Sequence, residues 1–303
     1  MRAPSPPTPE RVLRRLEWQV IRRLDGEMQG DYRTMFHGPG VDFADLREYE
    51  PGDDVRHIDW NVTARMDTPF IRQYLADREL TAWLLLDRSA SMAFGPVDRP
   101  KELVLTELAS TIARLFTRNG NRVGAILYNN SVERTIPPRG GRMQVLHLTH
   151  ELMKPSPSGS AGAGTATNLT GLVRFAMNTI KRRSLVVLVS DFISVPGWER
   201  SLALLSQRHE LVAIRLVDPR ETELPDVGLI AVEDAETGEV VYVDTGDPEF
   251  RKRYADVSAT RQTELDLAAK RAGIQMDTVS TEEDLASALV RIVKRRQRQR
   301  RRR

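Results

Sequence analysis

Two carboxylates and several hydroxyls stand at three separate points of the chain, where one folded site could collect them. Asp87 is followed by Ser89 and Ser91 at a spacing of two, and Thr167 and Asp191 come later in the chain. Hard divalent cations such as Mg²⁺ prefer oxygen ligands in near-octahedral geometry, and two carboxylates offset the 2+ charge. These residue types predict a metal site that leaves coordination positions for water and for one outside ligand.

The apolar runs beside these residues predict the sheet that would position them. Ala82–Leu86 precedes Asp87, and Leu185–Val189 precedes Ser190 and Asp191. Short, continuous apolar runs are typical of strands buried on both faces of a sheet, and helical patterns lie between them. Alternating strands and helices predict an α/β fold with a mostly parallel sheet. In such folds the ligand site lies at the carboxyl ends of the strands.

The remaining patterns predict the rest of the architecture. Residues 26–80 have no long period and are rich in Gly, Asp and Arg, so we expect an irregular or β-rich segment there. Residues 227–244 alternate around Thr237–Gly238, which indicates a hairpin. Further expected elements are helices near 10–25, 105–116, 141–153, 169–180, 197–207, 247–272 and 285–293, strands near 123–128, 211–217 and 274–279, and an edge strand at 132–136.

The oxygen-bearing residues also have a plain structural explanation. Asp and Ser directly after a strand often cap the next helix, and each of these residues taken alone is more often a cap than a ligand. The metal hypothesis therefore depends on the convergence of all three segments.

The three segments together resemble the metal motifs of von Willebrand factor A domains. D-R-S-A-S at Asp87–Ser91 resembles the D-x-S-x-S motif, T-N-L at Thr167–Leu169 resembles the threonine motif, and V-S-D at Val189–Asp191 resembles the second aspartate motif. The resemblance implies a metal-ion-dependent adhesion site in which the side chains bind Mg²⁺, or another divalent cation such as Mn²⁺ or Ca²⁺, directly or through water. The implied ligands are Asp87, Ser89, Ser91, Thr167 and Asp191. Thr165 is the alternative ligand. Thr167 matches the threonine motif better, and it directly precedes the helix. In that family an acidic residue of a partner protein fills the open metal position.

A second motif precedes the first aspartate. Residues 47–60 read R-E-Y-E-P-G-D-D-V-R-H-I-D-W and resemble the signature R-x-Y-x-x-G-D-D-x-R-x-I-D-W of the bacterial family named domain of unknown function 58 (DUF58). This resemblance implies a partnership with MoxR-type AAA+ ATPases and a role in protein maturation or complex assembly. We expect the signature acids Asp53, Asp54 and Asp59 to pair with Arg47 and Arg56. A partner-facing acidic patch is the alternative.

Composition limits the classes of protein to consider. The chain has 303 residues, 40% of them hydrophobic, and no cysteine, which excludes disulfides and cysteine-ligated metal centres and fits a reducing compartment. The proline-rich stretch 1–9 lacks the apolar core of a secretory signal. The longest apolar runs fall far short of the roughly 20 residues that span a bilayer. We therefore expect a soluble, cytoplasmic protein without a transmembrane segment.

Positive charge is concentrated at the C-terminus. Residues 291–303 contain nine Arg or Lys and no acid; without them 36 basic and 42 acidic residues remain, a net charge of −6 against +3 for the whole chain. Clustered arginine attracts any polyanion without reading its sequence. An adaptor that binds polyanions through this tail is one alternative function, and a solvated, disordered tail is the simpler interpretation.

Enzyme chemistry has weaker support. A haloacid-dehalogenase-type phosphatase needs a second acid two residues after its strand-end aspartate, where this chain has Ser89. The sequence has no G-x-S-x-G elbow, no Walker-type P-loop and no metal-type spacing among its five histidines. A metal-dependent hydrolase that uses the same oxygen cluster stays an alternative, although no general base can be named for it.

These observations combine into one expected organisation. Residues 1–79 would hold an N-terminal helix and the family signature, residues 80–293 a von Willebrand factor A-like, Rossmann-type domain with helices on both faces of its sheet, and residues 294–303 a basic disordered tail. We expect a metal-dependent protein-interaction module, without enzymatic activity and without sequence-specific nucleic-acid binding.

Overall fold

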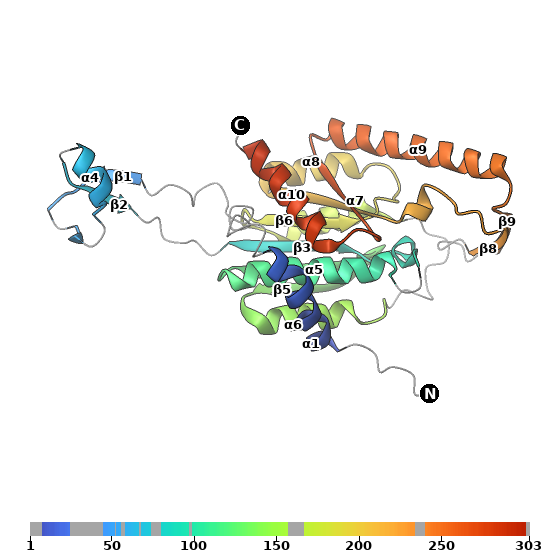
Figure 1. Ribbon diagram of the computed structural model, residues 1–303, viewed down its shortest axis with the longest axis horizontal. Helices are drawn as coiled ribbons and strands as arrows, with labels where there is room; N and C mark the ends of the chain where they lie inside the picture. The colour runs from blue at the N-terminus through green and yellow to red at the C-terminus, as the bar shows by residue number, and fades with distance from the viewer. Residues whose placement is uncertain are drawn as a thin grey trace.

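A six-stranded sheet forms the centre of the protein (Figure 1). Its strands have the order β10-β7-β6-β3-β4-β5. The computed structural model is described over residues 8–24, 45–51, 53–55, 58–66, 68–73, 80–96, 99–156, 167–233 and 240–300. The strands are β3 (Thr81–Asp87), β4 (Arg122–Asn129), β5 (Ser131–Arg139), β6 (Leu185–Ser190), β7 (Glu210–Val217) and β10 (Met276–Ser280). All neighbouring strands pair in parallel except β4 and β5. The predicted α/β fold with a mostly parallel sheet is confirmed.

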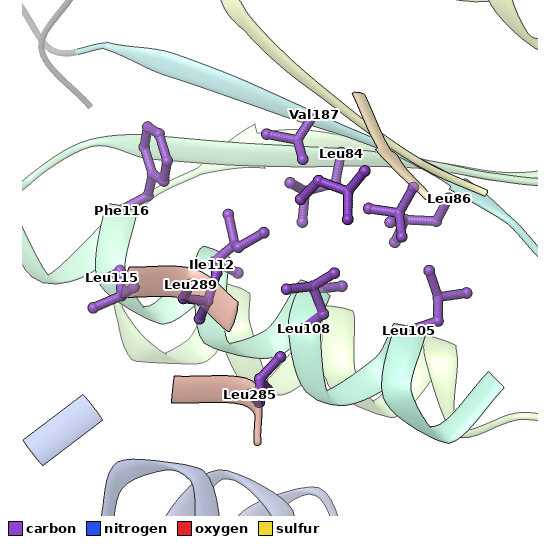
Figure 2. Close-up of a cluster of buried hydrophobic side chains, with 14 of the residues drawn as sticks. Leu84, Leu86, Leu105, Leu108, Ile112, Leu115, Phe116, Val187, Leu285 and Leu289 are labelled. Carbon is purple, nitrogen blue, oxygen red and sulfur yellow. The ribbon is translucent and has the colours of Figure 1, made fainter. Parts of the chain in front are cut away.

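Helices cover both faces of this sheet, because successive residues of a strand point to opposite faces. Leu84 and Leu86 of β3 join one core, and Trp83 and Leu85 join the other. Figure 2 shows Leu84 and Leu86 facing the apolar side of α5. The first core includes α5 (Lys101–Arg118), α6 (Gly141–Leu152) and α10 (Leu285–Arg300). The second core includes α7 (Leu169–Thr179) and α8 (Trp198–Arg208), with α9 (Pro248–Arg271) packed against it.

The N-terminal helix belongs to the first core. Helix α1 (Pro9–Leu16) starts at the N-cap Thr8, whose hydroxyl accepts a hydrogen bond from Arg11 N, and continues into the π-helical segment η1 (Glu17–Ile21). Its stripe of apolar side chains is buried with those of α5, α6 and α10. The sequence pattern predicts this helix in a separate region that ends at residue 79. In the structure the helix packs on the first core, because an amphipathic helix needs a partner for its apolar face.

Parts of the signature region form a small unit. Strands β1 (Asp45–Glu48) and β2 (Phe70–Gln73) pair antiparallel, and α4 (Trp60–Met66) lies between them in the chain. Asp59 is buried and accepts a hydrogen bond from Val62 N, and Asp53 accepts one from Glu50 N. The predicted ion pairs of these acids need Arg47 and Arg56. The position of Arg56 and the side chain of Arg47 lie outside what is described, so that pairing stays a prediction.

The C-terminal part contains the expected hairpin and one correction. Strands β8 (Leu229–Glu233) and β9 (Val240–Asp244) pair antiparallel, and the predicted turn between them lies outside the described residues. Helix α10 continues to Arg300, so the prediction of a disordered tail is wrong for residues 294–300. Arg295 pairs with Asp277 and Arg296 with Glu210, which fixes this segment on the sheet. Among the described residues, none of the helices has the length and the apolar composition needed to cross a membrane.

Candidate functional site

Asp87 is the last residue of β3, and its carboxylate is fully buried. The pairing of Leu86 with Val189 places Ser190, at the end of β6, next to it. Oδ2 of Asp87 accepts a hydrogen bond of 2.6 Å from Ser190 Oγ, and Oδ1 accepts one of 2.9 Å from Ser89 N. These two partners are neutral, so they satisfy the carboxylate oxygens without cancelling the negative charge.

The residues after Asp87 turn back on themselves. Ser89 is the N-cap of the short 3-10 helix η3 (Ala90–Ala93), and the buried Met92 donates its backbone N–H to Ser89 O at 2.9 Å. This tight turn brings Ser89 Oγ and Ser91 Oγ to within 3.1 Å of each other. The two hydroxyls therefore form a pair at the carboxyl end of β3.

Asp191 directly follows β6, and the chain changes direction immediately after it. Phe192 has a φ angle of 60°, a left-handed conformation that is uncommon for a residue with a side chain. An edge-to-face contact with Trp198, with ring centroids 5.3 Å apart, fixes the Phe192 ring. The turn brings Ile193 N to 2.9 Å from Oδ1 of the buried Asp191. Asp191 thus occupies the same edge of the sheet as Asp87.

Thr167 lies in the loop before α7 and is joined to the loop after Asp191. Its carbonyl accepts hydrogen bonds from Ser194 Oγ at 2.8 Å and from Val195 N at 2.9 Å. The hydroxyl of Tyr128, on β4, lies 2.9 Å from the carbonyl of the next residue, Asn168. Thr167 is buried at this junction. The alternative ligand, Thr165, lies outside the described residues.

The two aspartates affect each other electrostatically. Burial and, to a smaller extent, the negative charge of Asp191 raise the pKa of Asp87 from 3.8 to about 6, and the hydrogen bonds from Ser190 and Ser89 only partly oppose this. The negative charge of Asp191 disfavours the ionised form of Asp87, and a cation bound beside the two carboxylates would offset that penalty.

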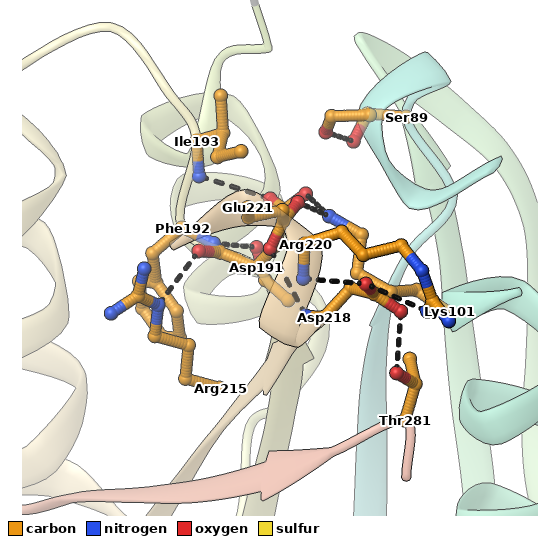
Figure 3. Close-up of polar contacts among 12 residues, drawn as sticks. Ser89, Lys101, Asp191, Phe192, Ile193, Arg215, Asp218, Arg220, Glu221 and Thr281 are labelled. Carbon is orange, nitrogen blue, oxygen red and sulfur yellow. Dashed lines mark hydrogen bonds and ion pairs between the residues drawn. The ribbon is translucent and has the colours of Figure 1, made fainter. Parts of the chain in front are cut away.

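A lysine that the sequence analysis did not single out contacts Asp191. Lys101, the first residue of α5, is completely buried, and its Nζ lies 2.7 Å from Asp191 Oδ2 and 2.5 Å from Glu221 Oε1 (Figure 3). One sequence signal could have found it, since Lys101 lies four residues before Leu105 and so continues the buried stripe that runs on to Leu108.

A second buried cation belongs to the D-R-S-A-S motif itself. The Arg88 guanidinium, 3% exposed, pairs with Glu133 at 3.0 Å and Glu102 at 3.1 Å, and donates a hydrogen bond to Lys154 O at 2.5 Å. Glu133 belongs to β5, Glu102 belongs to α5, and Lys154 lies two residues after the end of α6. Arg88 therefore anchors the D-R-S-A-S turn to β5, α5 and the residues after α6.

The donor set suits a hard cation. The structure brings Asp87, Ser89, Ser91 and Asp191 to one edge of the sheet and holds Thr167 in the loop bonded to the one after Asp191. No three His, Cys, Asp or Glu side chains of the described residues form a group that could hold a metal ion. A cation bound here would therefore rely on hydroxyl oxygens beside two carboxylates, the ligand class that Mg²⁺ prefers.

Comparison with known families gives a family for the chain. The family model described as "Protein of unknown function DUF58" matches residues 45–264. The chain belongs to this family. The DUF58 chain is also 37% identical over 287 residues to "Uncharacterized protein Rv1480" of Mycobacterium tuberculosis, covering 95% of this chain and 89% of that protein. The predicted DUF58 membership is thereby confirmed.

Solved structures give more distant similarity. The DUF58 chain is similar to the conserved hypothetical protein BatB from Bacteroides thetaiotaomicron, with 15% identity, a TM-score of 0.47, and coverage of 71% of this chain and 98% of that one. It is also similar to the vWF domain of the type V pili tip protein Mfa5 from Porphyromonas gingivalis, with 12% identity, a TM-score of 0.30, and coverage of 71% and 86%.

Proposed function

We propose that this protein is a metal-dependent protein-interaction module. Mg²⁺, or another divalent cation such as Mn²⁺ or Ca²⁺, binds to the oxygens of Asp87, Ser89, Ser91, Thr167 and Asp191, directly or through water, and an acidic residue of a partner protein occupies the remaining position. The observation that carries this proposal is the burial of two mutually repelling aspartates beside a pair of hydroxyls at the carboxyl edge of a parallel sheet.

The ligand types explain why such a site would select an acidic partner. Two carboxylates offset the charge of a divalent cation, and the hydroxyls of Ser89, Ser91 and Thr167 add none. The cation keeps an attraction for a further carboxylate, which is the chemistry that it supplies when bound. The chain itself orients the ligands, through the hydrogen bonds from Ser190 to Asp87 and from Ile193 to Asp191.

The resemblance of residues 47–60 to the DUF58 signature leads us to propose a MoxR-type AAA+ ATPase, or a client on which that ATPase acts, as the partner. The module would then work in protein maturation or complex assembly in the cytoplasm. The same site would serve either partner, because both would present a carboxylate to the metal.

Metal binding and partner retention test the proposal together. Titration of the purified protein with Mn²⁺, followed by electron paramagnetic resonance, measures affinity for the cation. Pull-downs from the native cell extract, with Mg²⁺ and with EDTA, measure partner retention. Asp87→Asn removes a ligand charge with almost no change in volume, and Asp256→Asn, on the exposed face of α9, is the matched control.

We expect wild type and Asp256→Asn to bind Mn²⁺ and to retain an AAA+ ATPase or another partner only when metal is present. Asp87→Asn should lose both properties while its circular dichroism spectrum stays native. Retention of the same partners by every variant, with and without EDTA, would contradict metal-mediated association. Retention that falls steeply with salt and survives Asp87→Asn would favour the basic tail as the binding surface.

A further inference from the structure

The ammonium of Lys101 is the most unusual charge in the described part of the molecule. It is fully enclosed, and its side chain is among the largest of those with less than 2% exposure. Lysine is almost never completely buried unless it is paired, because removing an ammonium from water costs several kcal/mol. Here the ammonium forms ion pairs with the carboxylates of Asp191 and Glu221, which offset its loss of hydration.

The position of Lys101 matters because Asp191 is a proposed metal ligand. Its Oδ2 contacts the lysine ammonium at 2.7 Å, and its Oδ1 accepts the N–H of Ile193 at 2.9 Å. Both oxygens of Asp191 therefore have protein partners. A metal ion that draws on the charge of Asp191 has to share that carboxylate with an ammonium already bound to it.

The second partner of Lys101 fixes the ammonium from the other side. Glu221 ends the short 3-10 helix η4 (Pro219–Glu221), and its second carboxylate oxygen accepts the N–H of Asp218 in a capping box. The carbonyl of Glu221 accepts a hydrogen bond from Ser258 on α9 at 2.8 Å. The lysine thus connects α5, the loop after β6, η4 and, through Glu221, α9.

We propose that Lys101 is a resident cation of the site. It neutralises Asp191 when no metal is bound, and it competes with the metal ion for that carboxylate, so that it sets the metal affinity of the protein. Glu221 weakens this competition by taking part of the ammonium's charge. The inference rests on the proposed metal site and adds a regulator to it: binding of metal, and therefore of an acidic partner, stays readily reversible because Asp191 has an alternative cation.

Two substitutions should shift metal affinity in opposite directions, which a purely structural role for Lys101 would not produce. Lys101→Met keeps the length of the side chain and removes its charge, so Mn²⁺ affinity should rise by about ten-fold or more, since one positive charge is lost within contact distance of a ligand. Glu221→Gln leaves the ammonium to Asp191 alone, so Mn²⁺ affinity should fall several-fold. Arg220→Met removes an equal charge from the same 3-10 helix at a side chain 41% exposed, and is the matched control.

Thermal unfolding gives a second readout that does not depend on partner binding. In EDTA, Lys101→Met should melt below wild type, because Asp191 loses its cation. Saturating Mn²⁺ should raise its melting temperature by more than it raises that of wild type. Glu221 is only partly buried, so Glu221→Gln tests the proposal even if Lys101→Met fails to fold.

The outcomes separate the two proposals. Mn²⁺ binding by wild type, combined with unchanged affinity in Lys101→Met or Glu221→Gln, would overturn the role of Lys101 and leave the metal site standing. An equal rise in affinity in Arg220→Met would also overturn it, because the effect would then come from overall charge. Absence of Mn²⁺ binding in wild type and in Lys101→Met alike would overturn both proposals.

Discussion

Arg88 and Lys101 are two buried cations at the same edge of the sheet, and they have different kinds of partner. The Arg88 guanidinium pairs with Glu102 and Glu133, neither of which is a proposed metal ligand. The Lys101 ammonium pairs with Asp191, which does. Both cations depend on the first turn of α5, where Lys101 itself and the Arg88 partner Glu102 are consecutive residues.

This difference shows how one helix start can serve both the scaffold and the site. A planar guanidinium with several carboxylate and carbonyl partners fixes a turn, since its donors have set directions. A flexible ammonium between two carboxylates can leave one of them when another cation arrives. We therefore expect changes at Arg88 to alter stability without regard to metal, and changes around Asp87 and Asp191 to have a metal-dependent component.

The largest effect should follow Arg88→Met. Removal of one partner of a buried ion pair leaves Glu133, 5% exposed, without its cation, so the free energy of unfolding should fall by about 3–5 kcal/mol. Urea unfolding with EDTA and with saturating Mn²⁺ measures this loss, which should be the same in both conditions. Arg174→Met, at an exposed position of α7, is the control and should change stability little. If Mn²⁺ restored the stability that Arg88→Met loses, the proposed difference between a structural Arg88 and a metal-linked Lys101 would be wrong.

A smaller effect should follow Ser190→Ala. Ser190 Oγ donates to Asp87 Oδ2 and accepts the N–H of Phe192 at 2.9 Å, so its removal leaves two buried polar groups without this partner. The free energy of unfolding should fall by about 1–3 kcal/mol in EDTA, as measured by urea unfolding. Mn²⁺ should recover part of the loss, because the cation stabilises the buried negative charge of Asp87 that has lost its hydrogen bond from Ser190. A metal-independent loss as large as that of Arg88→Met would show that Ser190, like Arg88, stabilises the fold without regard to metal.

The smallest effect concerns Glu151, which belongs to the Arg88 side of the edge. Burial acts to raise the pKa of Glu151, but the hydrogen bond from Lys154 and the charges of Arg134 and Lys154 outweigh it and lower the pKa below 4.5. The folded state therefore favours ionised Glu151. This stability is present above about pH 4.5 and is lost as the pH falls through the lowered folded-state value.

Glu151→Gln should accordingly reduce the free energy of unfolding by about 0.5–1 kcal/mol at pH 7, a small value because both cations are about half exposed and screened by solvent. Chemical unfolding of the variant and of wild type at pH 7 and at pH 3.5 measures the difference, which should shrink at the lower pH. A difference that grows as the pH falls would show that the charge of Glu151 does not stabilise the fold.

The sequence was sufficient to predict the sheet and the placement of most candidate ligands. Asp87 and Asp191 follow continuous apolar runs, and in a parallel sheet such runs place the residues after them at one edge. Lys101 was missed because a charged residue at a helix start is normally solvated. Only the contacts of its ammonium with Asp191 and Glu221, which come from distant parts of the chain, show that its side chain points inwards.

The prediction of a disordered C-terminal tail failed for a related reason. A run of Arg and Gln without apolar residues indicates disorder when it is judged by composition alone. Arg295 and Arg296, however, reach Asp277 and Glu210 on neighbouring strands, and these partners lie far from them in the sequence. Long-range ion pairs of this kind leave no local pattern, so neither the tail nor the lysine could be placed without the fold.

The pairing of β3 with β6 has a consequence for the way the chain folds. The two strands lie side by side although α5, β4, β5, α6 and α7 separate them in sequence, so their contact closes a long loop. Contacts of this kind form slowly, because the entropy of loop closure is lost before the contacts compensate for it. Asp87 ends one of these strands and Asp191 follows the other. We therefore expect the two aspartates to lie apart in a nascent or partly folded chain, so that the site is not yet formed. On the proposed function, only a chain that has completed its sheet would bind the metal ion and recruit an acidic partner.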